Sequence, residues 1–389
     1  MQTKSLPVLL LCAFLACCLL LPNAAAAEAD TKSAYKAYLA TGEIPSLCAA
    51  WADQFFIGAA VSLQALQDKA ILEAAKTHFN SLTCENEMKA ESVMDYQATL
   101  LQGDDTRVAL NMAKAEPLLA FARENGMKVR AHTLVWHNQT PDWFFREGFK
   151  NTKDAPYASR ETMLLRMENY IRDVMAWCEI NFPGLIYAWD VVNEAIEPSD
   201  RHPLGYRTKN NGWYATLGDD WIKLAFTFAR RYAAPGQELF YNDYNCYQPE
   251  KAAAIRMLLS SLLAEGLVDG IGMQSHITMD YPFLPDYEKA MKAYAAMGLT
   301  VQVTELDVNT QDGTAAGQTR LAARYKRLFA LLQKAKGEGV PITSVTFWGV
   351  SDKYTWLTDF GKTSYPLLFD GDVRPKPAFF GALLDLAIP

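Results

Sequence analysis

The sequence predicts an α/β protein, a single-domain (β/α)8 TIM barrel, from two observations. Strand-like apolar runs alternate with segments of helical periodicity from about residue 54 to the end of the chain. About eight such runs are present, and eight strand–helix units close into a parallel barrel. A doubly wound open sheet is the alternative, but no Gly-rich phosphate-binding fingerprint follows the first run.

The expected strands are short and bounded by turn or helix signals. They cover residues 55–61, 79–84, 128–136, 186–192, 239–244, 269–273, 300–304 and 342–348. Helical spacing of apolar residues appears within 164–178, 255–262 and 321–332. We expect Gly126, Gly266 and Gly337 to end helices, a helix or arm over 28–50 to lead into the barrel, and a last helix over 377–386.

Length and composition favour one large domain. The chain has 389 residues, of which 50% are hydrophobic and 12% aromatic, enough for one barrel-sized core. The net charge is −7, and no run of Lys or Arg resembles a phosphate-binding surface. Nucleic acid is therefore not an expected partner, and a neutral, hydroxylated ligand such as a polysaccharide suits this composition better.

The first 27 residues have the pattern of a secretory signal peptide. Lys4 precedes an apolar run over 6–21, interrupted by Pro7, and small residues follow up to Ala27. We expect residues 28–389 to form the secreted domain, extracellular or periplasmic. A retained anchor is disfavoured because the run is shorter than the roughly 20 residues a membrane-spanning helix needs. Lipid attachment within the segment is an alternative, and its candidate cysteines are Cys12, Cys17 and Cys18.

Four further cysteines, at positions 48, 84, 178 and 246, are widely spaced and form no CxxC pair. They indicate no zinc motif, and secretion permits disulfides without requiring them. His132 and His137 are five residues apart on one expected strand, so their side chains point to opposite faces and cannot share an ion. No metal and no cofactor is expected.

Polar and aromatic side chains gather where the expected strands end, and these ends form the active face of such a barrel. Three of the chain's five histidines are among them. Sugars bind to flat aromatic surfaces together with fixed hydrogen-bonding groups, so the set predicts a sugar pocket. Its members are Glu85, Asn86, Lys89, His132, Trp136, His137, Gln139, Asn193, Glu194, Asn242, Asp243, Tyr244, Asn245, Gln274, Ser275, His276, Glu305, Asp307, Trp348, Asp352 and Trp356.

Glu194 and Glu305 are the candidate catalytic pair within this set. A retaining glycosidase needs one carboxyl as general acid/base and a second, about 5 Å away, as nucleophile. Either glutamate alone is better explained as an ordinary strand-end residue, and the surrounding side chains reverse that interpretation. His276 and Asp307 are expected to hydrogen-bond Glu305 or each other, which would keep Glu305 ionised.

Three further roles follow from the same chemistry. Glu194 should have a raised pKa in a less polar setting near Trp136, so that it carries a proton. Asn193 can hydrogen-bond the 2-hydroxyl of the sugar in the −1 subsite. Asp190 is expected to support the site without acting in catalysis. The alternative for His276 is a buried core histidine with no part in the chemistry.

Seven motifs in order along the chain resemble those of glycoside hydrolase family 10, the endo-β-1,4-xylanases. They are TCENEMK at 83–89, HTLVWHNQ at 132–139, WDVVNEA at 189–195, YNDYN at 241–245, GMQSH at 272–276, TELD at 304–307 and FWGVSD at 347–352. The resemblance implies endo-hydrolysis of β-1,4-xylan with retention, Glu194 as acid/base and Glu305 as nucleophile. It implies xylan and xylo-oligosaccharides as partners; we expect a monomer.

The resemblance also implies that ten residues shape the −2 and −1 subsites: Glu85, Asn86, Lys89, His132, Trp136, Gln139, Gln274, His276, Trp348 and Trp356. Tyr244 joins the expected substrate contacts. Trp356 and Gln139 can crowd the hydroxymethyl group that distinguishes glucose from xylose. For Lys89, a salt bridge with Glu85 is the structural alternative. The segments 96–107 and 199–211 depart from the usual family pattern, which leaves chain-length preference and tolerance of xylan side chains open.

Two other functions remain compatible with the sequence. The same barrel could act on cello-oligosaccharides or aryl β-glycosides, or the protein could be a carbohydrate-binding component without turnover. The intact glutamate pair argues against a pure binder, which has no need of a proton donor opposite a nucleophile.

Overall fold

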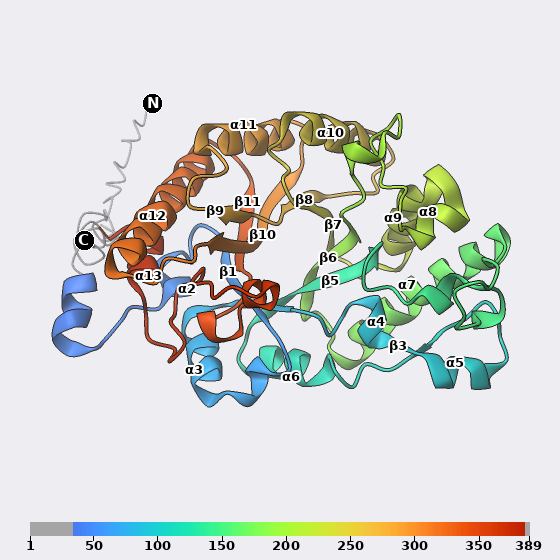
Figure 1. Ribbon diagram of the computed structural model, residues 1–389, viewed down its shortest axis with the longest axis horizontal. Helices are drawn as coiled ribbons and strands as arrows, with labels where there is room; N and C mark the ends of the chain where they lie inside the picture. The colour runs from blue at the N-terminus through green and yellow to red at the C-terminus, as the bar shows by residue number, and fades with distance from the viewer. Residues whose placement is uncertain (1–33, 386–389) are drawn as a thin grey trace, which may run out of the picture.

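The computed structural model describes residues 34–385, and its central element is a closed parallel barrel (Figure 1). Nine strands form the main sheet, and all but β9 make up the barrel. Strand β11 pairs in parallel with both β10 and β1, which closes the ring. The predicted (β/α)8 fold is thus confirmed. The barrel strands are β1 (Phe56–Val61), β2 (Ser81–Cys84), β5 (Lys128–Trp136), β6 (Ile186–Asn193), β7 (Glu238–Asp243), β8 (Gly270–Met273), β10 (Thr300–Asn309) and β11 (Ile342–Phe347).

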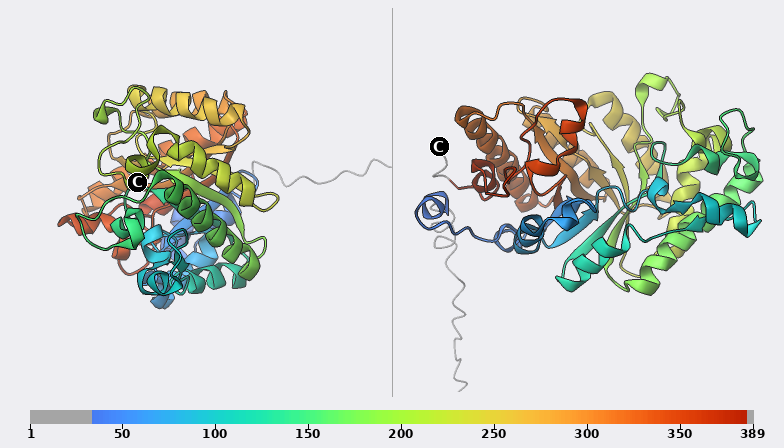
Figure 2. Two further views of the ribbon diagram at one scale, coloured as in Figure 1. Left: turned by 90° about the vertical axis from the view of Figure 1, so that its right-hand side faces the viewer. Right: turned by 60° about the horizontal axis from the view of Figure 1, so that its bottom comes forward.

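The helices lie outside the barrel, as the views in Figure 2 show. A small antiparallel pair, β3 (Met94–Asp95) with β4 (Ala109–Leu110), lies beside the barrel sheet in the connection between β2 and β5. The helices are α2 (Leu47–Ala50), α3 (Lys69–His78), α4 (Ala90–Val93), α5 (Tyr96–Gln102), α6 (Glu116–Glu124), α7 (Arg160–Asn181), α8 (Gly212–Leu217), α9 (Trp221–Tyr232), α10 (Pro249–Ala264), α11 (Leu284–Ala295), α12 (Ala315–Gly337) and α13 (Pro377–Ala382).

The three predicted helix stops are confirmed. Gly126 and Gly266 follow α6 and α10 with φ of +67°, the left-handed conformation that glycine adopts at little cost. Helix α12 ends at Gly337, but here the left-handed conformation is taken two residues later, by Gly339 with φ of +92°.

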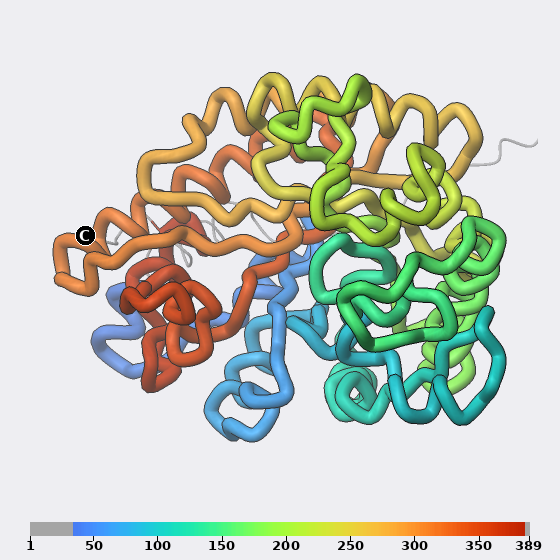
Figure 3. The backbone as a smooth tube through the Cα atoms, turned by 45° about the vertical axis from the view of Figure 1, so that its right-hand side comes forward, coloured from blue at the N-terminus to red at the C-terminus, as the bar shows by residue number. Residues whose placement is uncertain are grey.

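The N-terminal arm packs against the C-terminal helix, and both ends of the described chain lie on the same side of the barrel (Figure 3). Residues 34–41 are helical, and the rings of Tyr35 and Phe380 lie 5.0 Å apart. The predicted leading helix is present over this part of its range. Helix α13 ends at Ala382, earlier than expected, because Leu384 adopts a positive φ of 60°. The predicted signal peptide lies outside the described residues, as does Leu386.

No helix within residues 34–385 has the length and apolarity to cross a membrane. In the same part of the chain Cys48, Cys84, Cys178 and Cys246 are all free thiols.

Strand β10 is twice as long as predicted, which changes the position of Glu305. Its first half pairs with β8, and its second half pairs with β9 (His276–Thr278), so that Asp307 lies beside His276. Glu305 therefore lies within a strand and not in the loop after it. The register against β11 shifts between Val303 and Leu306. Such bulges re-aim side chains next to active sites, and this one directs Glu305 into the barrel mouth.

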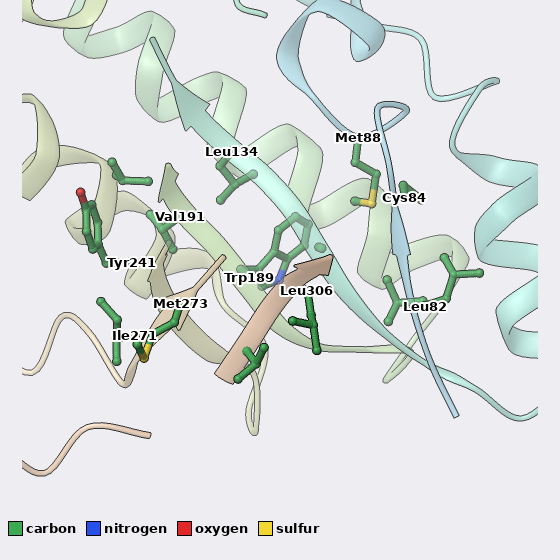
Figure 4. Close-up of a cluster of buried hydrophobic side chains, with 14 of the residues drawn as sticks. Leu82, Cys84, Met88, Leu134, Trp189, Val191, Tyr241, Ile271, Met273 and Leu306 are labelled. Atoms are coloured by element: carbon green, nitrogen blue, oxygen red, sulfur yellow. The ribbon is translucent and has the colours of Figure 1, made fainter. Parts of the chain in front are cut away.

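Apolar side chains of the strands pack between the sheet and the helices. Figure 4 shows this cluster, in which Leu82, Trp189, Val191 and Leu306 come from three different strands, β2, β6 and β10. The barrel interior is instead polar. Arg130 on β5 donates from Nε to Gln302 Oε1 on β10 at 2.7 Å, and these strands are not neighbours, so the contact crosses the interior.

We predict that Arg130→Met lowers the free energy of unfolding by about 3–5 kcal/mol. Arg130 is buried and forms a bidentate ion pair with the equally buried Asp190. Removing one partner leaves an uncompensated charge in the interior, which is the costly case for buried pairs. Urea unfolding followed by circular dichroism measures the change. The matched control is Arg374→Met, which breaks an exposed pair with Asp370 and should cost about 1 kcal/mol or less. Equal losses in the two variants would contradict the prediction.

Candidate active site

A cavity of about 600 Å³ opens at the carboxyl ends of the strands, where the fold places an active face. Both candidate catalytic glutamates and every residue expected to touch substrate line it. Asn138, Asn245 and Asp359 also line it. We call this cavity the cleft. Its lining residues are Glu85, Asn86, Lys89, His132, Trp136, Asn138, Gln139, Asn193, Glu194, Tyr244, Asn245, Gln274, His276, Glu305, Trp348, Trp356 and Asp359.

Glu305 is buried and surrounded by hydrogen-bond donors. His276 Nε2 lies 3.0 Å from one carboxyl oxygen, and Asn242 Nδ2 donates to the other at 2.7 Å. Burial alone would raise the pKa of Glu305. The nearby imidazole of His132 and the charge and hydrogen bond of His276 outweigh it and lower that pKa to about 2. Glu305 is therefore ionised at neutral pH, as a nucleophile must be.

His276 forms a hydrogen bond with Glu305 and is not an isolated core histidine. Its Nδ1 lies 2.8 Å from Asp307 Oδ2, and the parallel register of β9 and β10 sets this contact. Burial alone would lower the pKa of His276, but the charge of Asp307 with its hydrogen bond, and then Glu305, raise it to about 10. Trp356 Nε1 donates to the same Asp307 oxygen at 2.8 Å. This bond connects Trp356, which lines the cleft, to the charged residues Asp307, His276 and Glu305.

The opposite charges of His276 and Glu305 predict a pH-dependent contribution to the stability of the fold. Protonated His276 stabilises the fold fully below its ordinary pKa of 6.5, and the effect is lost as pH rises toward 10. Ionised Glu305 stabilises the fold fully above its ordinary pKa of 4.5, and the effect is lost as pH falls toward 2. The contribution is therefore largest between pH 4.5 and 6.5.

His276→Gln should thus lower Tm most between pH 4.5 and 6.5, and less on either side. Thermal unfolding of the wild type and variant across this range and beyond it measures the difference. His202→Gln is the control, because His202 lies outside the cleft and pairs with Asp219 at 3.1 Å. A loss of Tm that is the same at every pH would show that His276 acts by packing alone.

Glu194 directly follows β6, where the backbone turns sharply out of the strand. Its φ is +57°, and its N–H donates to Asn242 O at 2.9 Å. Burial raises the pKa of Glu194, and the charges of Asp243 and Glu305 add to the effect. The direction is the one expected for a proton donor, opposite to that of Glu305.

The expected influence of Trp136 on Glu194 was wrong in sign. Trp136 does lie beside Glu194, but its Nε1 donates to Glu194 Oε2 at 3.0 Å, and Gln274 Nε2 donates to Oε1 at 3.0 Å. Both bonds favour the ionised carboxylate and so lower its pKa. The raised pKa comes from burial and from neighbouring negative charge, and not from an apolar indole face.

A relay of side-chain amides joins the two glutamates. Asn193 Oδ1 accepts from Asn242 Nδ2 at 3.0 Å and from Gln274 Nε2 at 3.1 Å. Asn242 also bonds Glu305, and Gln274 also bonds Glu194. Asn193 Oδ1 thus accepts two bonds, and Asn193 Nδ2 donates to Glu194 Oε1 at 3.4 Å, which leaves the second N–H of Nδ2 to meet a hydroxyl group of a ligand. The sequence predicted that Asn242 belongs to the pocket but assigned it no role, because only the fold shows that its side chain reaches Glu305.

His132 is held by the polar interior below the cleft. Its Nδ1 lies 2.8 Å from Asp190 Oδ2 and 3.9 Å from Glu305 Oε1. Asp190 is fixed in turn by Arg130. This is the supporting position expected for Asp190.

Lys89 is bound to amides and not to Glu85. Its Nζ donates to Asn86 Oδ1 at 2.9 Å and to Gln139 Oε1 at 3.0 Å, and it lies 5.1 Å from the centroid of the Trp136 ring. The alternative salt bridge with Glu85 is therefore not formed. Burial raises the pKa of Glu85 to about 7, although Lys89 opposes the shift. Glu85 is left facing the cleft, with its carboxyl available to a ligand.

Tyr244 lines the other end of the cleft, close to Glu194. Its hydroxyl donates to Glu197 Oε2 at 3.0 Å and accepts from Arg207 Nη2 at 3.0 Å. Lys251 Nζ lies 3.3 Å from the ring centroid and pairs with buried Asp243 at 2.7 Å. Neither Arg207 nor Lys251 was found from the sequence, because each lies outside the strand-end motifs.

Six residues that the sequence grouped with the site do not line the cleft. Asn242, Asp243 and Asp307 are buried beside it, whereas the other three lie apart from it. His137 lines a separate cavity beside α8, and burial lowers its pKa to about 3. Ser275 is buried, with its hydroxyl 2.7 Å from Tyr287 Oη. Asp352 pairs with buried Lys376 at 2.7 Å. Residues next to one another at a strand end alternate in direction, so only some of them face the cleft.

Comparison with known proteins agrees with this geometry. The sequence model of glycosyl hydrolase family 10 matches residues 46–384. Endo-1,4-beta-xylanase B of Butyrivibrio fibrisolvens is 41% identical over 343 residues, which cover 87% of this chain and 53% of that protein. This chain thus spans about half the length of that relative. Endo-1,4-beta-xylanase B of Paenibacillus barcinonensis is 39% identical, with 87% of this chain and 97% of that protein covered.

A solved structure shares the fold over most of the chain. The CBM22-1–GH10 modules of Clostridium thermocellum endo-1,4-beta-D-xylanase 10B, complexed with xylohexaose, superpose with a TM-score of 0.80 at 33% identity. The match covers 88% of this chain and 68% of the other. The resemblance drawn from the seven motifs is confirmed, and the chain belongs to glycosyl hydrolase family 10.

Proposed function

We propose that the protein is a retaining endo-β-1,4-xylanase. The observation that carries the proposal is the pair of carboxyls in one cleft, each with hydrogen-bonding partners on its neighbours, whose pKa values are shifted in opposite directions. A binding protein has no need of such a pair, whereas a double displacement needs one protonated and one ionised carboxyl. The xylanase names of the relatives and the xylohexaose bound to a family member support xylan as the substrate.

In the first step Glu305 attacks the anomeric carbon, and a bond forms between its carboxyl oxygen and that carbon. The bond to the glycosidic oxygen breaks, and Glu194 gives its proton to the departing oxygen. His276 and Asn242 hold the attacking carboxylate in position through the bonds described above. In the second step Glu194 takes a proton from water, the water oxygen bonds to the same carbon, and Glu305 is released as a carboxylate. Two inversions retain the β configuration.

The residues at the two ends of the cleft indicate the direction in which a xylan chain lies in it. Glu85, Asn86 and Lys89 supply charged and amide groups for hydroxyls on the −2 side, and Trp348 and Trp356 form an aromatic wall. Trp356 and Gln139 would crowd a hydroxymethyl group, which favours xylose over glucose. Tyr244 and Asn245, near Glu194, would meet the leaving group. We further propose that the enzyme acts as a monomer, which light scattering of the purified protein tests.

A proton NMR time course on xylohexaose tests the proposal. Early appearance of the β-anomer, before mutarotation, with xylobiose and xylotriose as products, is the expected result. An early α-anomer would contradict retention, and an absence of turnover would contradict the activity. Rates on xylan and on carboxymethylcellulose separate the xylanase from a barrel that acts on cello-oligosaccharides.

Export is a separate proposal that rests on the sequence of residues 1–27. The intact mass of the protein recovered outside the cytoplasm should correspond to a chain that begins near residue 28. A mass that includes the first 27 residues would contradict cleavage.

A further inference from the structure

A second cavity, of about 620 Å³, is lined by α10, α11 and the loops that precede them, and the two helices follow one another along the upper edge of the barrel in Figure 1. We call it the groove. Three aromatic rings line it, from Tyr247, Tyr281 and Phe283. Tyr281 is 47% exposed and Phe283 is 66% exposed. Large aromatic side chains exposed together beside a cavity are typical of a binding site.

The loop that carries two of these rings is held in place without a ligand. Arg324 Nη2 donates to Pro282 O at 2.7 Å, and Thr278 and Tyr281 bond each other through Thr278 N–H to Tyr281 O at 2.7 Å. The rings of Tyr247 and Tyr281 meet edge to face at 5.4 Å. The aromatic surface is thus preorganised, which reduces the entropy lost when a ligand binds.

The groove is also lined by four charged side chains, Arg256, Asp280, Asp286 and Lys289. Within residues 34–385, none of the four forms a side-chain hydrogen bond or a close ion pair, although the charge of Asp280 acts on Arg324. Two are acidic and two are basic, so the groove carries no net charge from them. Free donors and acceptors beside aromatic rings, without excess charge, match a neutral polymer rich in hydroxyl groups.

The segment after β7 lines both the cleft and the groove. Tyr244 and Asn245 face the cleft, and Tyr247 and Gln248 face the groove. Tyr247 Oη donates to Asn245 Oδ1 at 2.8 Å, and Gln248 Nε2 donates to Tyr281 Oη at 3.2 Å. The groove therefore adjoins the end of the cleft to which the leaving group is assigned.

We propose that the groove binds a stretch of β-1,4-xylan distant from the bond being cleaved. The inference rests on the proposed function, because it takes its ligand from the substrate assigned to the cleft. A polymer engaged in both places is held more tightly than either place alone would hold it, since the second contact becomes intramolecular. A short oligosaccharide that fills only the cleft gains nothing from the groove.

The test compares binding to insoluble xylan in a Glu305→Ala background, which prevents hydrolysis. Adding Tyr281→Ala and Phe283→Ala should weaken binding to the polymer roughly tenfold, because two aromatic surfaces are lost. The Kd for xylotriose, measured by calorimetry, should not change. In the active enzyme, kcat/KM on xylan should fall while that on an aryl β-xylobioside stays the same.

Two control variants separate the groove from general effects of mutation. Tyr281→Phe keeps the ring and should keep the binding. Tyr157→Ala removes a tyrosine of similar exposure, 44%, from a different cavity and should also bind xylan as before. Unchanged polymer binding in the double variant, or an equal loss in Tyr157→Ala, would overturn the inference. Failure of the wild type to cleave xylan would instead overturn the proposed function, so the two failures are distinguishable.

Discussion

Replacing Glu305 with alanine should reduce xylan hydrolysis to the background rate. The variant lacks the carboxylate that forms the covalent bond, and no other side chain can take its place because His276 and Asn242 are hydrogen-bond donors to Glu305. Release of reducing sugar from xylan measures the loss. The matched control is Glu238→Ala, which removes a carboxyl from the opposite end of the barrel, where Glu238 begins strand β7. That variant should retain activity close to wild type.

Added azide gives the Glu305→Ala experiment a second readout. With an activated aryl β-xylobioside, azide can occupy the space of the missing carboxylate and attack from its face, so the product should be the α-glycosyl azide. Substantial remaining hydrolysis of xylan, or an azide product of β configuration, would contradict the role assigned to Glu305.

Glu194→Gln should lower kcat/KM on xylan by roughly 10²- to 10⁴-fold, the usual contribution of a general acid or base. The amide cannot protonate the departing sugar oxygen. A dinitrophenyl β-xylobioside has a leaving group that needs no proton, so its first step should remain fast and only the second step should slow. A burst of dinitrophenol followed by slow turnover is the expected stopped-flow trace.

The same variant should change the pH profile. In the wild type, activity requires ionised Glu305, whose pKa is lowered to about 2, and protonated Glu194, whose pKa is raised above its ordinary 4.5. Activity should therefore persist far into the acid range and fall on the alkaline side as Glu194 loses its proton. In Glu194→Gln the alkaline fall should vanish. Its persistence would assign that ionisation to another group, and Glu85, with a pKa near 7, would be the first to examine.

The sequence alone determined the fold class and the rim of the barrel that forms the cleft. Strands and helices alternate in the periods of a parallel barrel, and in such a barrel every strand points its carboxyl end at the same rim. Motifs hundreds of residues apart, such as those at Glu85 and Glu305, could therefore be placed together without knowing any distance. Both glutamates and all the expected substrate contacts line one cavity for this reason.

The tertiary structure decided which rim side chains face the cleft and what surrounds each one. His137, Ser275 and Asp352 lie on the same rim, but their side chains point away from the cleft. The direction of a side chain depends on strand bulges and strand register, which the local sequence pattern does not reveal. The charged partners of buried acids, Lys251 with Asp243 and Arg130 with Asp190, come from helix and strand positions outside the motifs. A pKa is set by burial and by charges close in space, so the opposite shifts of Glu194 and Glu305 became visible only once the chain was folded.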